Sequence, residues 1–296
     1  STNNVWVGTM AGLSRYNEKL DRFDNNYPQF DNTPIWSITE NSNNQLIVTT
    51  ADSLYVLDNA EGVKKIDLND HNEKINEIKT VFQDADYNYW LGTYENGLFI
   101  SNETFTTIRK ADGKNRWSLK VDATAVFSVK QLDGDYWVAT DNGLFIISRN
   151  YRVKKHILLS DYGYSEQANV TRTVVPFDDD KYLLATENGL FEYDTLNERL
   201  QSIESMNVNS QFVKTETVYD LFVDSRSSIW IATLHNGALK YHNSYGLFPH
   251  YLPSVNGIKT TVRAFTELSD GQVWVGTDFE GIYYFDLETQ SLEKSS

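Results

Sequence analysis

The stretch Val273-Trp274-Val275-Gly276-Thr277 decides the fold, because copies of it recur from one end of the chain to the other. Near-identical copies occupy residues 6–9, 90–93, 137–140 and 230–233, and less regular ones occupy residues 47–50 and 183–186. The threonines that close the copies stand at positions 9, 50, 93, 140, 186, 233 and 277, so they are 41 to 47 residues apart. This period is typical of proteins in which each repeat is one small antiparallel sheet of a propeller or solenoid.

A tight turn follows each copy. Its glycines are Gly12, Gly97, Gly143, Gly189, Gly237 and Gly281, and only the second copy has a serine there, Ser53. Glycine adopts a positive φ at no steric cost, so its recurrence at this place predicts one hairpin geometry in all repeats.

Each repeat supplies four strands graded from apolar to polar. Upstream of each copy lies an alternating apolar run, which we call the axial strand, at residues 35–39, 78–82, 126–129, 174–177, 218–223 and 262–265. Downstream of the hairpin comes a more polar strand, as at residues 20–23, 63–66, 153–157, 200–203 and 291–294. Helical periodicity of useful length is absent. The sequence predicts an all-β, seven-bladed β-propeller of four-stranded antiparallel blades, forming a single domain over residues 1–296.

The first repeat is incomplete. Residues 5–9 already form the second strand of a blade, with no axial strand before them. We therefore expect blade one to lack its inner strand, and expect this chain to be a fragment of a longer multidomain protein that supplies the strand.

Composition excludes several classes of partner. A formal charge of -15 and a pI near 4.7 argue against sequence-independent binding to nucleic acid, which needs a basic surface. One basic cluster, residues 149–156, lies on a predicted outer strand, where Lys and Arg commonly protect an exposed edge. No run of apolar residues is long enough to span a bilayer, so contact with a membrane is expected only through other segments of the parent protein.

The sequence offers little for catalysis. The five histidines have no metal-binding spacing, and cysteine is absent. Asp220 is the only carboxylate in the middle of an axial strand, and a glycosidase needs two. We expect no catalytic residue, no metal and no cofactor.

The repeat resembles the two-component regulator propeller repeat. The best copies are Val5-Trp6-Val7-Gly8-Thr9 with Gly12-Leu13-Ser14-Arg15-Tyr16, and Trp137-Val138-Ala139-Thr140 with Asn142-Gly143-Leu144-Phe145. The resemblance implies the periplasmic sensor region of a Bacteroidetes hybrid two-component system. Such regions typically hold two seven-bladed propellers, followed by a β-sandwich, a membrane span and a histidine kinase. They commonly sense oligosaccharides, so the resemblance implies a non-catalytic, carbohydrate-sensing, periplasmic domain.

Two other functions stay open. The chain could be a scaffold that binds only protein, such as the adjacent propeller of the parent chain or a second copy in a homodimer. It could also resemble the streptogramin lyases, which would require a histidine base and a metal at one mouth of the propeller. His235 is the only histidine in a turn expected to reach that mouth.

The predicted ligand site is the mouth at which the axial strands begin. Counting back from each repeated threonine places six residues at the strand heads: Trp36, Lys79, Phe127, Thr173, Tyr219 and Arg263. The turns after the threonines should border the same face with Tyr94, Glu95, Asp141, Glu187, His235 and Phe279. Aromatic faces beside cations and a hydroxyl suit an oligosaccharide, whose C–H faces stack on rings while its hydroxyls form hydrogen bonds. The alternative is that these side chains only pack between blades or fill the channel.

Overall fold

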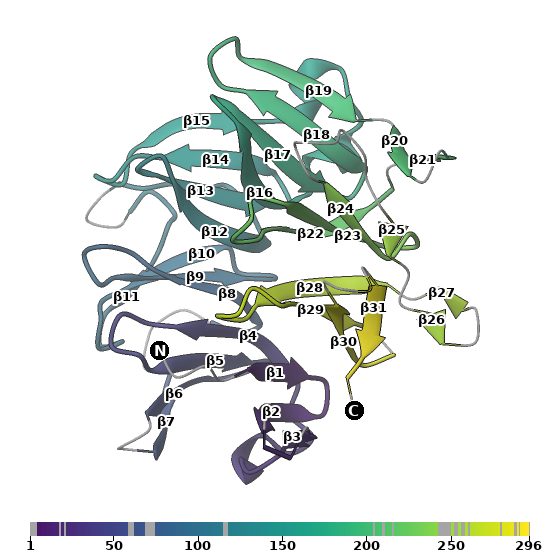
Figure 1. Cartoon of the computed structure of the whole chain (residues 1–296). Coiled ribbons are helices and arrows are strands. Elements are labelled where there is room, and N and C mark those ends of the chain that lie inside the picture. Colours follow the sequence, from purple (N-terminus) through teal and green to yellow (C-terminus); the bar gives the residue numbers. More distant parts are fainter. Residues whose placement is uncertain are drawn as a thin grey trace. The chain divides into compact units, whose positions relative to one another are not determined.

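Figure 1 shows the computed structural model of the chain. It describes residues 5–17, 19–20, 22–58, 62–68, 75–114, 118–203, 205–208, 211–214, 216–241, 250–251, 254–255, 258–259, 261–278, 280–286, 289 and 291–295. The chain falls into two compact units, Ser1–Leu158 and Leu159–Ser296. The single domain over residues 1–296 stays a prediction.

The first unit contains four antiparallel sheets in chain order. They are β1(Trp6–Thr9), β2(Gly12–Asn17) and β3(Arg22–Asp24); β4(Ile35–Glu40), β5(Leu46–Thr50), β6(Leu54–Asp58) and β7(Gly62–Ile66); β8(Ile78–Gln83), β9(Tyr89–Thr93), β10(Leu98–Ser101) and β11(Ile108–Lys110); and β12(Val126–Leu132), β13(Asp135–Thr140), β14(Gly143–Ile147) and β15(Val153–Ile157). We number these sheets blades 1 to 4.

The second unit contains three more, blades 5 to 7. They are β16(Thr171–Asp178), β17(Lys181–Thr186), β18(Gly189–Asp194) and β19(Arg199–Ile203); β22(Val218–Val223), β23(Ile229–Thr233), β24(Ala238–Tyr241) and β25(His250–Tyr251); and β28(Val262–Glu267), β29(Val273–Thr277), β30(Ile282–Asp286) and β31(Ser291–Lys294). Two hairpins that the sequence did not predict precede blades 6 and 7: β20(Ser205–Val208) with β21(Gln211–Lys214), and β26(Ser254–Val255) with β27(Ile258–Lys259).

The fold prediction is confirmed: the chain is an all-β, seven-bladed β-propeller of four-stranded antiparallel blades, and blade 1 has three strands. The described helices are three short 3₁₀ segments, η1(Pro28–Phe30), η2(Leu159–Tyr162) and η3(Glu166–Asn169). Among the described residues, no helix is long and apolar enough to cross a bilayer.

The repeated tryptophans pack between neighbouring blades. Trp90 in blade 3 is fully buried, and its ring lies 4.5 Å from that of Tyr136 in blade 4. Trp230 in blade 6 is equally buried and lies 5.0 Å from Phe285 in blade 7. Aromatic rings contribute large areas to such contacts, so the tryptophan of the motif stabilises the stacking of one sheet on the next.

The repeated threonine and glycine close the hairpin between the second and third strands. In blade 4, Thr140 Oγ1 donates to the Gly143 carbonyl at 2.8 Å and accepts from the Asn142 amide at 3.0 Å. Gly143 has a φ of +86°, and a Cβ there would overlap the carbonyl oxygen of Ile157. The motif therefore recurs because this turn needs both the hydroxyl and the missing side chain.

Candidate functional site

Each of the six axial strands begins with a β-bulge. In β8, Ile78 pairs with Thr93 and Thr80 pairs with Gly92, so Lys79 is one extra residue between two consecutive pairs. The same shift occurs in β4, β12, β16, β22 and β28. We call the extra residues the bulge residues; they are Trp36, Lys79, Phe127, Arg172, Tyr219 and Arg263. A bulge re-aims a side chain away from the regular alternation of a strand, so these positions are suited to presenting side chains.

The bulge residues include five of the six predicted strand heads, and Thr173 is the exception. Thr173 pairs with Ala185 and is buried, whereas its neighbour Arg172 is the bulge residue. The prediction was one residue out because β16 has a second irregularity between Pro176 and Asp178. The extra residue in β16 compensates for the short turn between β16 and β17. The number of residues from the bulge residue to the repeated threonine is therefore the same in blade 5 as in the blades with longer hairpins.

Burial separates the bulge residues from their surroundings. The residue before each one is buried, whereas the bulge residues themselves are partly or fully exposed. These six buried residues, each directly before a bulge residue, are Ile35, Ile78, Val126, Thr171, Val218 and Val262. One strand position therefore anchors the blade in the core while the next faces outward.

In the first unit, four predicted site residues from three consecutive blades lie in contact. We call this set the aromatic row: Trp36, Lys79, Tyr94 and Phe127. Lys79 Nζ lies 3.0 Å from the centroid of the Trp36 ring and 5.1 Å from that of Tyr94. The Tyr94 ring lies edge-on to Phe127, with centroids 6.4 Å apart. The ammonium is thus held between two aromatic rings by cation–π attraction.

Two members of the aromatic row, Tyr94 and Trp36, have groups that a ligand could contact. Tyr94 is 47% exposed, so much of its surface is open to solvent. The indole N–H of Trp36 is buried and has no hydrogen-bond partner among the described residues. Buried tryptophan N–H groups usually have a partner, so this one is a donor that a bound ligand or an ordered water could satisfy.

In the second unit, the bulge residues form a charged arrangement that we call the arginine row: Arg172, Tyr219 and Arg263. The Arg263 guanidinium lies 3.9 Å from the Tyr219 ring centroid, and that of Arg172 lies 5.8 Å from the same ring. Asp278 accepts two hydrogen bonds from Arg263, at 2.6 and 2.8 Å, and Glu187 pairs with Arg172. The pKa of Arg263 is raised, and its hydrogen bonds to Asp278 are the largest cause. Both guanidinium groups are therefore fixed by carboxylates from the turns.

The remaining predicted turn residues have different roles. Asp141 accepts from the backbone of Thr124 and Ala125, at 3.0 Å each, and so fixes the chain before β12. Glu95 and His235 are exposed. Phe279 lies outside the described residues. Asp278 was missed by the sequence reasoning, although an acidic residue directly after the repeated threonine also occurs at Asp141 and Glu187.

Histidine and acidic side chains are not gathered into a metal-binding group in the described part of the chain. No set of three or more His, Asp or Glu side chains is placed to hold a metal ion there. Asp220, the carboxylate in the middle of an axial strand, is partly exposed and accepts from the amide of Leu221 at 2.9 Å.

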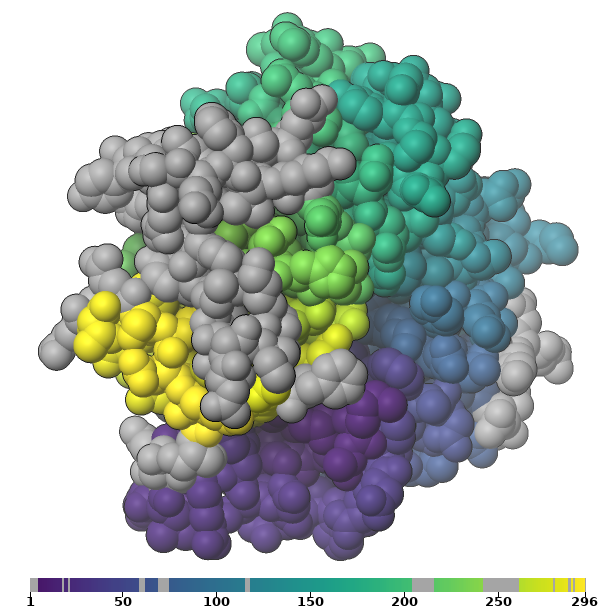
Figure 2. Space-filling view, turned by 90° about the vertical axis from the view of Figure 1, so that its right-hand side faces the viewer, coloured from purple at the N-terminus to yellow at the C-terminus, as the bar shows by residue number. Residues whose placement is uncertain are grey.

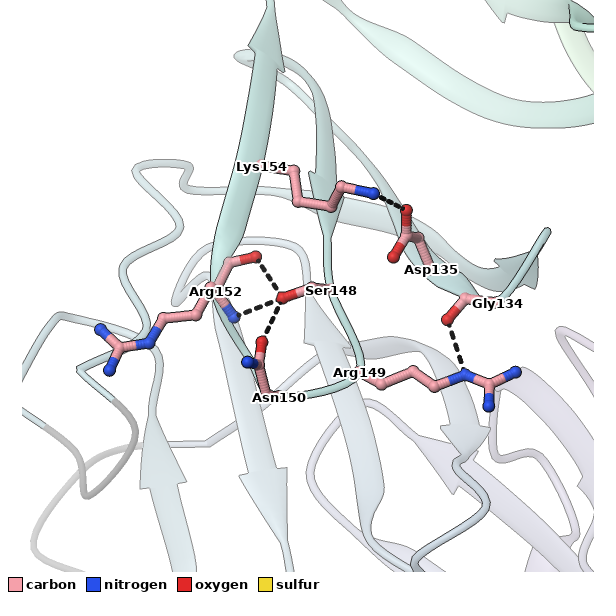
Figure 3. A network of polar contacts seen from close by, with 7 residues as sticks. All are labelled: Gly134, Asp135, Ser148, Arg149, Asn150, Arg152 and Lys154. Atoms are coloured by element: carbon pink, nitrogen blue, oxygen red, sulfur yellow. Dashed lines mark hydrogen bonds and ion pairs between the residues drawn. The ribbon is translucent and has the colours of Figure 1, made fainter.

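Two cations of the basic cluster at residues 149–156 make contacts within their own blade (Figure 3). Lys154 pairs with Asp135 at 2.6 Å, and Arg149 Nε donates to the Gly134 carbonyl at 3.0 Å. These two cations therefore tie the outer strand β15 and the turn before it to β13 and the turn that precedes β13. That the cluster protects the edge of the sheet stays a prediction.

No protein-family model matches the chain, and no curated protein matches it in sequence. Solved structures do match. The extracellular domain of the putative hybrid two-component system BT3049 from B. thetaiotaomicron is 16% identical, with a TM-score of 0.56, over 92% of this chain and 41% of that one. The corresponding domain of BT4673 from the same organism is 20% identical, with a TM-score of 0.51, over 99% and 41%. The WD40 β-propeller domain of Doa1 is 12% identical, with a TM-score of 0.66, over 97% and 90%.

The chain spans about two fifths of the length of the two B. thetaiotaomicron domains. At these identities the likenesses establish the fold. The chain is thus a β-propeller whose structural neighbours include both extracellular domains of putative two-component systems, the class that its repeat resembles, and WD40 domains.

Proposed function

We propose that the chain is a non-catalytic ligand-recognition propeller of a periplasmic hybrid two-component sensor, and that it senses an oligosaccharide. The observation that carries this proposal is the aromatic row, in which the partly exposed strand heads Trp36, Lys79 and Phe127 of three blades lie together with the exposed Tyr94. The resemblance of the repeat and the extracellular origin of two structural neighbours support the class and the location.

The chemistry of the row suits a saccharide. Tyr94 offers an exposed ring for stacking against the C–H face of a sugar. The Lys79 ammonium carries three donors, and the Trp36 indole adds one more that has no acceptor among the described residues. Directed donors beside an apolar face are the usual features of a site that fixes the orientation of a small polar ligand.

Lys79 also limits how the sugar can bind. Its ammonium lies 3.0 Å from the Trp36 ring centroid, so one face of that indole is already covered. A sugar at this site stacks on Tyr94 and receives hydrogen bonds at its edge. Tyr94 is then the residue whose removal should cost the most affinity, with the least risk to the fold.

The test is a screen of oligosaccharides against the purified chain, followed by calorimetric titration of any that binds. Tyr94→Ala should weaken binding by about tenfold or more, because the sugar loses the ring on which it stacks. A tenfold change corresponds to a loss of ~1.4 kcal/mol of binding free energy. Tyr87→Ala is the matched control. Tyr87 is 50% exposed, like Tyr94, but it precedes β9 at the other end of the strand.

Equal weakening by both substitutions, or unchanged affinity in Tyr94→Ala, would remove the aromatic row as the binding site. If no oligosaccharide binds while a second protein does, the protein-binding scaffold becomes the better assignment.

A further inference from the structure

A lysine of the protein itself lies where a ligand cation would bind. Lys79 Nζ is 3.0 Å from the centroid of the Trp36 ring and 5.1 Å from that of Tyr94, and we call the space between these rings the cage. Sites that recognise an ammonium ligand have the same parts, aromatic rings grouped within about 6 Å of the charge. The blades that carry these residues run from purple to blue in the space-filling view of Figure 2.

The rings of the cage are positioned by contacts that do not involve Lys79. The backbone amide of Tyr94 donates to the Glu77 carbonyl at 3.0 Å, and Phe127 lies edge-on to the Tyr94 ring with centroids 6.4 Å apart. The indole of Trp36 is itself partly buried. We therefore expect the rings to keep their places when the ammonium leaves.

The cation of the cage differs from the one in the arginine row. Arg263 also lies on a ring, that of Tyr219, but it donates two hydrogen bonds to Asp278, at 2.6 and 2.8 Å. A ligand could replace Arg263 only by leaving that carboxylate without them. Lysine carries a compact charge on a flexible four-carbon stem, so the Lys79 ammonium can swing out of the cage while its backbone stays in β8.

The indole N–H of Trp36 indicates a second group of the ligand. This N–H is buried and has no acceptor among the described residues. A ligand with an oxygen beside its ammonium would satisfy it, and buried donors usually have such a partner. The formal charge of -15 also favours the approach of a cation over that of an anion.

We propose that Trp36 and Tyr94 form a cage for a ligand ammonium, and that Lys79 fills this cage until the ligand replaces it. Because it rests on the proposed function, the proposal also names the class of saccharide: an oligosaccharide that contains a protonated amino sugar.

An amino sugar carries the groups that the cage needs on neighbouring carbon atoms. Its ammonium takes the place of Lys79 Nζ, an adjacent hydroxyl accepts from the Trp36 indole, and the sugar ring lies against the exposed Tyr94. Two like charges repel at this distance, so Lys79 turns toward solvent as the ligand enters. An N-acetylated sugar has no charge with which to replace it.

The first experiment opens the cage by Lys79→Ala and uses choline as the probe in an NMR titration. The neutral comparison is the alcohol of the same shape in which a carbon atom replaces the choline nitrogen. Lys65→Ala is the matched control, since Lys65 Nζ lies 5.8 Å from the single ring of Tyr55 on the outer strand β7. Both substitutions change the net charge equally, so their difference reports the cage.

Lys79→Ala should bind choline about tenfold or more tightly than the wild type and Lys65→Ala do. The neutral alcohol should show no such gain, and Tyr94→Ala in the Lys79→Ala background should abolish it. Equal gains in both lysine variants, or an equal gain for the neutral alcohol, would overturn the proposal.

The second experiment uses the unmodified protein, so it does not depend on the folding of a variant. The methylene group beside the Lys79 ammonium lies near two rings, whose ring currents displace its NMR signal, and the signal is identified by its loss in Lys79→Arg. A trimer of glucosamine is added at about pH 6, where its amino groups are protonated. The signal should move to the position of a solvent-exposed lysine, and the N-acetylated trimer should leave it in place.

The two trimers also separate this inference from the proposed function. The glucosamine trimer should bind about tenfold or more tightly than its acetylated form. If both bind equally and Tyr94→Ala weakens both, the sugar-binding row stands and the cation cage is refuted. If neither binds, the amino-sugar assignment is refuted, while the screen of other oligosaccharides still decides the proposed function.

Discussion

Trp230 and Trp90 form a matched pair from which the contribution of one hydrogen bond can be isolated. Each indole N–H donates to an aspartate six residues earlier, Trp230 to Asp224 and Trp90 to Asp84, both at 2.9 Å. The two carboxylates are equally buried, each 5% exposed, and each also accepts from two amides of its own turn.

The two sites differ in their further side-chain donors, and Asp84 Oδ1 accepts a long hydrogen bond of 3.4 Å from the side-chain amide of Asn88. Asp84 Oδ2 also accepts from the hydroxyl of Tyr151 at 2.5 Å, whereas Trp230 is the only side-chain donor to Asp224 among the described residues. Trp230→Phe therefore leaves a carboxylate oxygen without its partner, and we expect a loss of about 1.5–3 kcal/mol for a hydrogen bond to a charged group. Trp90→Phe should cost less from this source, about 0.5–1.5 kcal/mol, because Tyr151 still donates to Asp84.

The loss of ring volume is the same in both variants, although the ring of Trp230 also lies 4.8 Å from the Lys240 ammonium, so the difference between them reports mainly the donors left to each carboxylate. Urea denaturation followed by circular dichroism gives the two free energies, provided that the slope of the transition is unchanged. Truncation to alanine at either site should cost about 3–5 kcal/mol. A loss in Trp90→Phe equal to or greater than that in Trp230→Phe would refute the reasoning.

Two further predictions concern the hairpin motif and the alkaline limit of stability. Thr140→Val should destabilise the protein by about 1–3 kcal/mol, because the buried hydroxyl bonds both Gly143 and Asn142. Thr9→Val, at the exposed equivalent position, should cost much less. Similar losses of melting temperature in the two variants would contradict this prediction. Burial, and then the charge of Asp84, raise the pKa of Tyr136 to about 12, so the folded chain keeps a proton that the unfolded chain loses above pH 10. Stability should therefore fall as the pH rises from 10 to about 12, and thermal melts of Tyr136→Phe should show a shallower fall.

The sequence predicted the fold well because the fold is repeated. The recurring threonine and glycine mark one hairpin in each blade, and the strand β15 begins and ends at the predicted residues. The hairpins β20–β21 and β26–β27 were missed because they occur once each, outside the repeat, so no second copy reveals them.

The candidate site was predictable in position but not in its contacts. Counting from the threonine located five bulge residues, and it failed at Thr173 because a single extra residue near Phe177 cannot be recognised from residue types. The sequence also gave no sign that Lys79 lies on Trp36, since that contact joins two blades and depends on the direction of both side chains.

The most direct test of the central claim, that the aromatic row binds the ligand, is fluorine NMR of the chain labelled with 5-fluorotryptophan. The protein has seven tryptophans, and each signal can be assigned by a single Trp→Phe substitution. On addition of an oligosaccharide that binds by calorimetry, the signal of Trp36 should shift while those of the buried Trp90 and Trp230 stay in place. An unchanged Trp36 signal at saturating ligand would contradict the claim.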